Sequence, residues 1–154
     1  MIFGALVDQP GRPRRTDVYR YAEGVLSAVA RYGDVMPDGW LFSTANARTW
    51  GLNDYGDLVF SARTRTLIPI PDLPGLFFGL SSMGVYASAN GTLQYVMRDG
   101  VTLFGAGYLA APPVPTAIIG SHGDVVFSTL TRDWATFEPI RHLLLKASPQ
   151  LIAK

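Results

Sequence analysis

Short apolar stretches rich in β-branched and aromatic residues, interrupted by Gly, Pro and charged residues, recur along this chain. Residues 18–31 form two stretches rich in β-branched and aromatic side chains around Glu23-Gly24, a pattern typical of a β-hairpin. Leu58-Val-Phe60 and Val125-Val-Phe127 are instead apolar at consecutive positions, as expected of strands whose sheets are covered on both faces. The pattern predicts an all-β protein of short antiparallel strands joined by tight turns.

The chain contains an internal repeat with an offset of 67 residues. Residues 17–61 return without a gap as residues 84–128, and eight of the first eighteen aligned pairs are identical. The hairpin turn of the second copy is Asn90-Gly91, the pair that most readily takes the positive φ values of a type I′ turn. Both copies therefore predict the same backbone.

A second turn recurs at the same offset. Asn53-Asp-Tyr-Gly56 suits a type I turn whose glycine is left-handed, and it leads into the strand Asp57–Ala62. The second copy keeps the glycine but has Gly120 and Ser121 in place of Asn53 and Asp54, an exchange that a calcium site would not tolerate. We therefore assign a structural role to this motif and to the hairpin glycines. The residues are Asn53, Gly56, Asp57, Val59, Phe60, Gly123, Asp124, Val126, Phe127, Gly24 and Gly91.

The repeat predicts a single domain of four-stranded units. Each unit has a hairpin, a variable connection (Trp40-Leu-Phe42 or Tyr108–Pro115), a third strand near Thr49–Leu52 or Thr116–Ile119, and an apolar fourth strand. The units are residues 17–62 and 84–129, with partial units at 1–16 and 130–154. Four antiparallel strands per repeat is typical of a β-propeller blade, so we expect a propeller-like fold, partial or completed by oligomerisation. A two-sheet β-sandwich of duplicated halves is the alternative.

Three further segments carry expectations of their own. Ile2-Phe-Gly-Ala5 resembles Val59-Phe-Ser-Ala62, which suggests that the chain starts within a unit. Leu67–Gly75 holds three prolines that exclude a central strand, so a loop is expected there. Residues 139–147 fit either the start of another hairpin, which we prefer, or a short helix.

Composition narrows the function classes. A chain of 154 residues with 48% hydrophobic residues can bury a real core. Its 13 basic and 12 acidic residues give a net charge of +1, which creates no field to gather nucleic acid. The absence of cysteine excludes disulfides, thiolate nucleophiles and cysteine-bound metals. No apolar run is long enough to span a membrane, and the first eight residues lack the features of a signal peptide.

Two motifs resemble a family of bacterial tandem-repeat proteins named for an Asn-x-x-Gly-x-x-(Ala or Val)-Phe motif. Asn53-x-x-Gly56-x-x-Val59-Phe60 matches that motif, and residues 31–39 are similar to the family's Arg-x-Gly-Asp-x-x-Pro-Gly segment. The likeness covers most of residues 1–133, although Gly120 replaces the motif asparagine and residues 101–104 lack the Asp and Pro. The resemblance implies a propeller-like repeat domain, an exported or cell-surface parent protein, and no catalytic residue.

Residues with catalytic or metal-binding chemistry are present but poorly arranged. His122 and His142 have no partner at a metal-ligand spacing. Ser121-His122-Gly123-Asp124 contains the residue types of a catalytic triad, but neighbouring residues on a turn point in different directions. We therefore predict no catalytic residue, metal or cofactor.

The remaining candidates have simpler structural interpretations. Turn chemistry explains most of the aspartates that might pair in a glycosidase, namely Asp34, Asp38, Asp54, Asp57, Asp99 and Asp124. Core packing is preferred over sugar stacking for the tryptophans, Trp40, Trp50 and Trp134. Arg12–Arg15 and Arg20 are expected in a solvated loop, and no nucleic-acid site is predicted.

The functional prediction is a non-enzymatic β-repeat scaffold or binding module. Two units and parts of others should leave incompletely covered ends, so we expect self-association or adjacent repeats of a longer chain. The alternative is a small polysaccharide-acting hydrolase or a lectin-like carbohydrate binder, which carbohydrate retention and turnover assays would distinguish.

Overall fold

The computed structural model describes residues 1–8, 10, 14–71, 73–89, 91–100, 108–110, 117–133, 135–136 and 139–148. All helical or extended structure in these residues is β-strand, which confirms the all-β prediction. The strands are, in chain order, β1 (Ile2–Val7), β2 (Arg15–Ala22), β3 (Val25–Ala30), β4 (Leu41–Leu52), β5 (Leu58–Pro69), β6 (Phe77–Ala89), β7 (Thr92–Arg98), β8 (Tyr108–Ala110), β9 (Ala117–Ile119), β10 (Val125–Arg132) and β11 (Pro139–Ala147).

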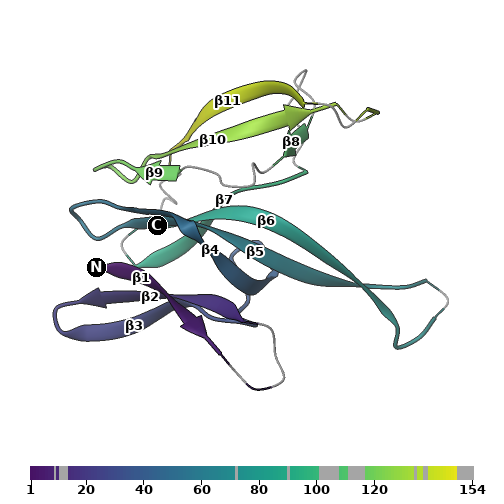
Figure 1. Ribbon diagram of the computed structural model, residues 1–154, viewed down its shortest axis with the longest axis horizontal. Coiled ribbons are helices and arrows are strands. Elements are labelled where there is room, and N and C mark those ends of the chain that lie inside the picture. The colour runs from purple at the N-terminus through teal and green to yellow at the C-terminus, as the bar shows by residue number, and fades with distance from the viewer. Residues whose placement is uncertain are drawn as a thin grey trace, which may run out of the picture.

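The strands form three antiparallel sheets that stack as layers (Figure 1). Sheet A has the order β1-β2-β3, and sheet B has the order β4-β5-β6-β7. Sheet C has the order β11-β10-β8, with β9 also paired to β10. Sheet B is the middle layer, with sheet A on one side and sheet C on the other (Figure 1).

The predicted hairpins β2-β3 and β6-β7 are present, and each pairs with the apolar strand that precedes it. Sheet B therefore combines β4 and β5 of the first sequence unit with β6 and β7 of the second. This arrangement follows from the connections, because the long β5-β6 hairpin keeps those two strands together while the segment after β3 crosses to the next layer (Figure 1).

Strand register reproduces the sequence repeat. Phe3 pairs with Tyr19 in sheet A, and Phe60 pairs with Tyr86 in sheet B. The two hairpins also share a register shift, which falls directly before Tyr19 in one and directly before Tyr86 in the other. The likeness of residues 2–5 to residues 59–62 thus reflects the same place in equivalent sheets.

Sheet B is buried on both faces, as the consecutive apolar residues of β5 predicted. Leu58 and Phe60 belong to the core cluster that also contains Val18 of sheet A. Val59 belongs to a second cluster, with Phe127 of sheet C. The same prediction was wrong for β10, where Val126 is only half-buried, because in the described residues sheet C has a neighbouring layer on one face alone.

The long β5-β6 hairpin corrects the expected proline loop. β5 continues to Pro69 and β6 begins at Phe77, which is its partner in the register. The first residues of the expected loop therefore lengthen a two-stranded ribbon, and only the turn at its tip is irregular. Proline is compatible with this position because Pro69 ends a strand outside the four-stranded part of the sheet.

One other expectation is corrected, and the strand that was preferred over a helix at residues 139–147 is present. Leu41-Phe42 and residues 108–110, expected in connections, belong to strands β4 and β8. Residues 139–147 form strand β11 and not a helix, and β11 pairs with β10 as β6 pairs with β5. Trp134 and residues 111–115 lie outside the described residues.

The recurring turn has the same backbone in both copies. Gly56 has φ +81° and Gly123 has φ +79°, and each donates its N–H to the carbonyl three residues earlier, at 3.1 and 3.0 Å. The hairpin glycines Gly24 and Gly91 each have φ +79°. These are left-handed conformations that glycine adopts without strain.

Gly56→Val should lower the free energy of unfolding by about 1–3 kcal/mol, since a β-branched residue is strained at positive φ. An added Cβ would also lie 2.8 Å from Nη2 of Arg20, which would have to move. Urea denaturation measures the loss. Gly120→Val is the matched control, because Gly120 has no positive φ and its added Cβ would meet only the Asp124 carbonyl oxygen, at 3.7 Å. Equal losses in the two variants would contradict the strain argument.

Candidate functional site

A buried polar cluster lies where the chain crosses from sheet A to sheet B. Asp38, in the loop before β4, accepts a hydrogen bond from Tyr86 Oη at 3.0 Å and forms an ion pair with Arg98. The Arg98 guanidinium carbon lies 3.5 Å from the centroid of the Trp40 ring. We call Asp38, Trp40, Tyr86 and Arg98 the clasp, because they join this loop to strands β6 and β7.

The loop itself is held by a tight turn. Gly39 has φ +80° and donates its N–H to the Met36 carbonyl at 2.8 Å, while Met36 donates to the Trp40 carbonyl at 2.7 Å. The Met36 side chain is buried in the core cluster between sheets A and B. Asp38 Oδ1 accepts a further hydrogen bond from the Trp40 N–H at 3.3 Å. The turn and its buried anchor therefore fix the position of the Asp38 carboxylate.

The electrostatics of the clasp depend on its burial. The side chains of Asp38 and Arg98 are each 11% exposed, so each charge needs the other. Burial raises the pKa of Tyr86 to about 12, from 10.0, although a hydrogen bond with Thr64 opposes the shift. Because the folded-state pKa lies above the unfolded one, the stability that neutral Tyr86 provides is complete below pH 10 and declines as the pH rises towards 12.

These properties indicate a structural role for the clasp. An acid or base that works near neutral pH needs a pKa near 7, whereas Tyr86 holds its proton more tightly than free tyrosine does. The Asp38 carboxylate is occupied by Tyr86, Arg98 and the Trp40 N–H. What the arrangement does well is to hold two layers of the protein together.

Two guanidinium groups and one aromatic ring make a second joint between sheets A and B. The Tyr32 ring lies 4.5 Å from the guanidinium carbon of Arg15 and 4.7 Å from that of Arg65. Asp17 accepts a hydrogen bond from the Tyr32 N–H at 3.1 Å and lies 3.8 Å from Arg15 Nε. Arg15, expected in a solvated loop, is therefore in strand β2 and mostly buried. Cation–π contact with Tyr32 is the physical reason.

Asn53 of the repeated motif joins sheet B to sheet C. Its Nδ2 donates to the Gly120 carbonyl at 2.9 Å, which is the equivalent position of the second copy. Its Oδ1 accepts the N–H groups of Tyr55 and Asp57, at 3.1 and 2.8 Å. Asn53 thus stabilises its own turn and binds the second copy through a backbone oxygen, which a glycine supplies as well as any residue.

The structure does not assemble the triad that the sequence suggested. Ser121 Oγ and His122 Nδ1 lie 3.2 Å apart on an exposed turn. Asp124 instead pairs with Lys146 Nζ at 2.7 Å, and the hydrogen bond from Lys146 lowers the pKa of Asp124. The side chain of His142 lies outside the described residues.

Three of the other predicted aspartates accept hydrogen bonds within the protein. Asp34 accepts the Arg31 N–H at 2.8 Å, Asp99 accepts the Met83 N–H at 3.2 Å, and Asp57 accepts Asn53 Nδ2 at 3.0 Å. Turn chemistry therefore explains Asp34 and Asp57, whereas Asp99 bonds to strand β6 16 residues away and the partners of Asp38 were missed. The signal for Asp38 is the retention of tyrosine and arginine in both hairpins, as Tyr19/Tyr86 and Arg31/Arg98.

Each of the two described tryptophans uses a face of its ring in packing within the protein. Trp40 is covered by Arg98, and Trp50 stacks on Phe60 with ring centroids 6.0 Å apart. A hollow of about 200 Å³, lined by Thr44, Ala45, Asn46, Arg63 and Met83, is smaller than typical ligand pockets. In the part of the chain that the structure describes, no group of three or more His, Asp or Glu side chains is placed to hold a metal ion.

Comparison with known proteins adds no relative, since no protein-family model, curated protein or solved structure matches the chain. None of the described residues forms a helix long and apolar enough to cross a membrane. The function therefore has to be argued from the geometry of the layers.

Proposed function

We propose that this chain is a non-enzymatic β-repeat scaffold or binding module of propeller-like design, in which equivalent sheets stack and are clasped to one another. The observation that carries the proposal is a comparison of sheets A and B. Sheet B has a layer on each face (Figure 1). Sheet A has an equivalent of the sheet B face that packs under sheet A, but in the described residues no layer covers it.

The uncovered face of sheet A repeats the aromatic pair of sheet B. Phe3 and Tyr19 are stacked with ring centroids 6.1 Å apart, and Phe60 and Tyr86 are stacked at 5.8 Å. Phe60 and Tyr86 are 0% exposed beneath sheet A, while Phe3 and Tyr19 are only half-buried. Because Ile2 packs into the core between sheets A and B, the neighbouring Phe3 points to the opposite side.

The arginine of the clasp is also present on sheet A. Arg31 is the equivalent of Arg98, but its side chain is 61% exposed and, within the part of the chain that the structure describes, forms an ion pair only with Asp34 of its own loop, at 3.8 Å. We call Phe3, Tyr19 and Arg31 the open socket. In sheet B the equivalent residues are Phe60, Tyr86 and Arg98. Sheet A covers Phe60 and Tyr86, and Tyr86 and Arg98 bind Asp38 of the loop. The open socket therefore suits a further unit that carries an aspartate in the same turn.

The outer face of sheet C is uncovered in the same way. Leu144 is 75% exposed, whereas Val85, at the equivalent place in sheet B, is 2% exposed. Incomplete ends of this kind are typical of repeat proteins without their capping or neighbouring units. They support a role as part of a larger assembly, made either by a longer chain or by further copies, and the motif resemblance supports an exported or surface-located parent.

An extended chain tests this proposal. Residues 1–58 would be placed directly before residue 2, so that Ile2 takes the place of Val59 and the added Asp38 approaches Tyr19 and Arg31. We expect amide hydrogen exchange of β1, β2 and β3 to slow at least about tenfold, because the open socket becomes covered. Exchange followed by mass spectrometry or NMR measures the effect.

The control is the same extended chain with Asp38→Asn in the added segment alone. It should keep the apolar cover but lose the ion pair, and its protection of β1–β3 should be intermediate. Unchanged exchange of β1–β3 in the extended chain, with the added segment unfolding separately, would contradict the proposal.

A further inference from the structure

The β5-β6 hairpin leaves the stacked sheets as an isolated ribbon. β4 pairs with β5 only as far as Arg65, and β7 pairs with β6 only from Gly84 onward. Beyond these points β5 and β6 pair with each other alone and project from the body (Figure 1). We call residues 66–69 and 77–82, with the turn that joins them, the arm.

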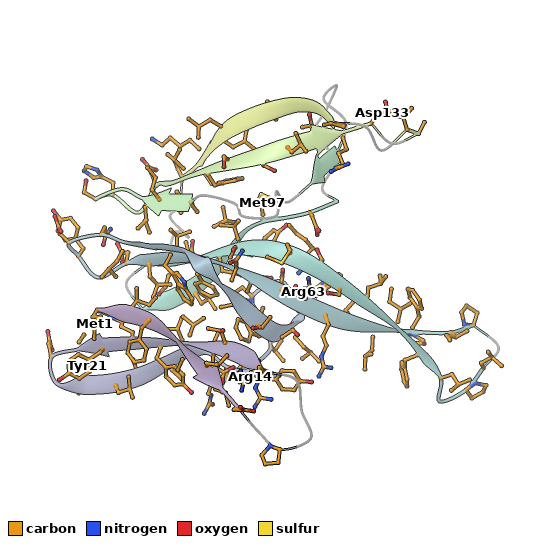
Figure 2. The ribbon with its side chains drawn as sticks, viewed as in Figure 1. Met1, Arg14, Tyr21, Arg63, Met97 and Asp133 are labelled. Atoms are coloured by element: carbon orange, nitrogen blue, oxygen red, sulfur yellow. The ribbon has the colours of Figure 1, made fainter. Side chains whose placement is uncertain are left out.

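The arm is apolar on both of its faces. Ile68 and Phe78 are paired on one face, while the neighbouring residues Leu67 and Phe77 point to the other. Figure 2 shows the side chains standing free on both sides of the ribbon, away from the stack. Seven large apolar side chains of the arm are between 37% and 57% exposed: Leu67, Ile68, Leu73, Leu76, Phe77, Phe78 and Leu80.

The area and charge of the arm favour association. The seven side chains together expose on the order of 600 Å² of apolar surface, the upper end of what a typical monomer shows in one patch. From Thr66 to Ser82 the sequence contains one charged residue, Asp72. Proteins that keep their edge strands apart place lysines, other charges or prolines along them. The β6 edge of the arm, Phe77–Ser82, has none of these.

The unpaired backbone groups at the edges of the arm determine which kind of partner can bind there. Half of the N–H and C=O groups along each arm strand point outward from the ribbon, where neither β4 nor β7 reaches them. The hydrocarbon of a membrane would leave those groups without hydrogen bonds, at a high cost. A β-strand satisfies them, and the proline-free β6 edge is the better acceptor because β5 ends in Pro69.

We infer that two copies of this protein associate through their arms, with β6 of one copy antiparallel to β6 of the other across a two-fold axis. Each arm supplies the same edge, so the interface is self-complementary and closed. The two arms together expose roughly 1,200 Å² of apolar side chain, comparable to the area that a small specific interface buries. This pairing uses none of the residues of the open socket and does not depend on the stacking of repeat units.

Analytical ultracentrifugation of the full chain tests the inference. We expect the dimer to form as the protein concentration is raised to about 100 µM. Phe78→Lys should raise the dimer dissociation constant about tenfold or more, because it removes apolar contact and brings like charges together across the axis. Tyr55→Lys is the matched control: Tyr55 is 74% exposed on a turn outside the arm, so its dissociation constant should stay unchanged.

Disulfide trapping tests the geometry. The chain contains no cysteine, so a single introduced thiol can react only with its copy in another molecule. Gly79→Cys and Ser81→Cys lie in the middle of the free β6 edge, and an antiparallel pair whose two-fold axis passes at either residue brings that residue within disulfide range of its copy. We expect rapid oxidation to a covalent dimer in one of these variants and none in Tyr55→Cys.

Three results would overturn the inference. The first is a chain that stays monomeric at the highest concentration. The second is a dimer that Phe78→Lys does not weaken and that neither arm cysteine traps. The third is a monomer that binds phosphatidylcholine vesicles in a Phe78-dependent way, which would assign the arm to lipid.

Discussion

Phe60→Ala is expected to lower the free energy of unfolding by about 3–5 kcal/mol, among the largest effects of any single side chain in the described residues. Phe60 is 0% exposed, and its ring stacks between those of Trp50, at 6.0 Å, and Tyr86, at 5.8 Å. Truncation would open a cavity between sheets A and B that rigid strands on both sides cannot close. Urea denaturation followed by tryptophan fluorescence measures the loss, and circular dichroism checks that the variant still folds.

Phe3→Ala is a control that the repeat itself provides. Phe3 is the same residue at the equivalent register position, but it is half-buried and its one stacked ring is Tyr19, at 6.1 Å. Its truncation should cost about 1–2 kcal/mol, since less apolar surface returns to water. If Phe60→Ala and Phe3→Ala lower the free energy of unfolding equally, the face of sheet B that carries Phe60 and the face of sheet A that carries Phe3 are covered to the same extent in solution.

Asp38→Ala is expected to cost about 3 kcal/mol, the second large effect, since it leaves the Arg98 charge buried without its carboxylate and Tyr86 Oη without its acceptor. The side chains of the buried pair are each 11% exposed. Chemical denaturation at neutral pH measures the change. Part of the lost free energy of unfolding should be regained in Asp38→Ala/Arg98→Met, because the double variant no longer buries an unpaired charge.

A surface ion pair provides the comparison for the clasp. Asp8 and Arg14 lie 3.2 Å apart with side chains 62% and 72% exposed, so Asp8→Ala should change the free energy of unfolding by no more than about 0.5 kcal/mol. If Asp8→Ala and Asp38→Ala have the same small effect, the clasp does not hold the layers together. A double variant as unstable as the Asp38 single variant would indicate that the loop, and not the charge, is responsible.

Local sequence chemistry predicted the turns and hairpins of this protein well. Asn90-Gly91 and Glu23-Gly24 mark the hairpins, and Gly56 and Gly123 mark the recurring turn, because positive φ values favour glycine within a few residues of chain. The same local logic predicted a loop at Leu67–Gly75 and missed that β5 and β6 continue into it. Proline excludes a strand with two neighbours, but it permits the end of a two-stranded ribbon.

The candidate site was harder to predict because its parts are distant in the sequence. Asp38 is 48 residues from Tyr86 and 60 from Arg98, and it lies in the loop that crosses between layers. Its position beside Pro37 and Gly39 fits a turn, and turn chemistry explained it without reference to any partner. Only the path of the loop between sheets A and B brings the carboxylate to Tyr86 and Arg98.

The sequence by itself determined the class of the fold, the turn geometry and the repeat, including the equivalence of residues 2–5 with residues 59–62 that the register bears out. These features depend on the residue types of strands and turns and on backbone preferences that act over a few residues. The tertiary structure decided which strands share a sheet and that Asp38 clasps two layers. It also decided that, among the described residues, one aromatic face and one apolar arm have no partner. Those features depend on contacts between segments far apart in the chain, which no local pattern encodes.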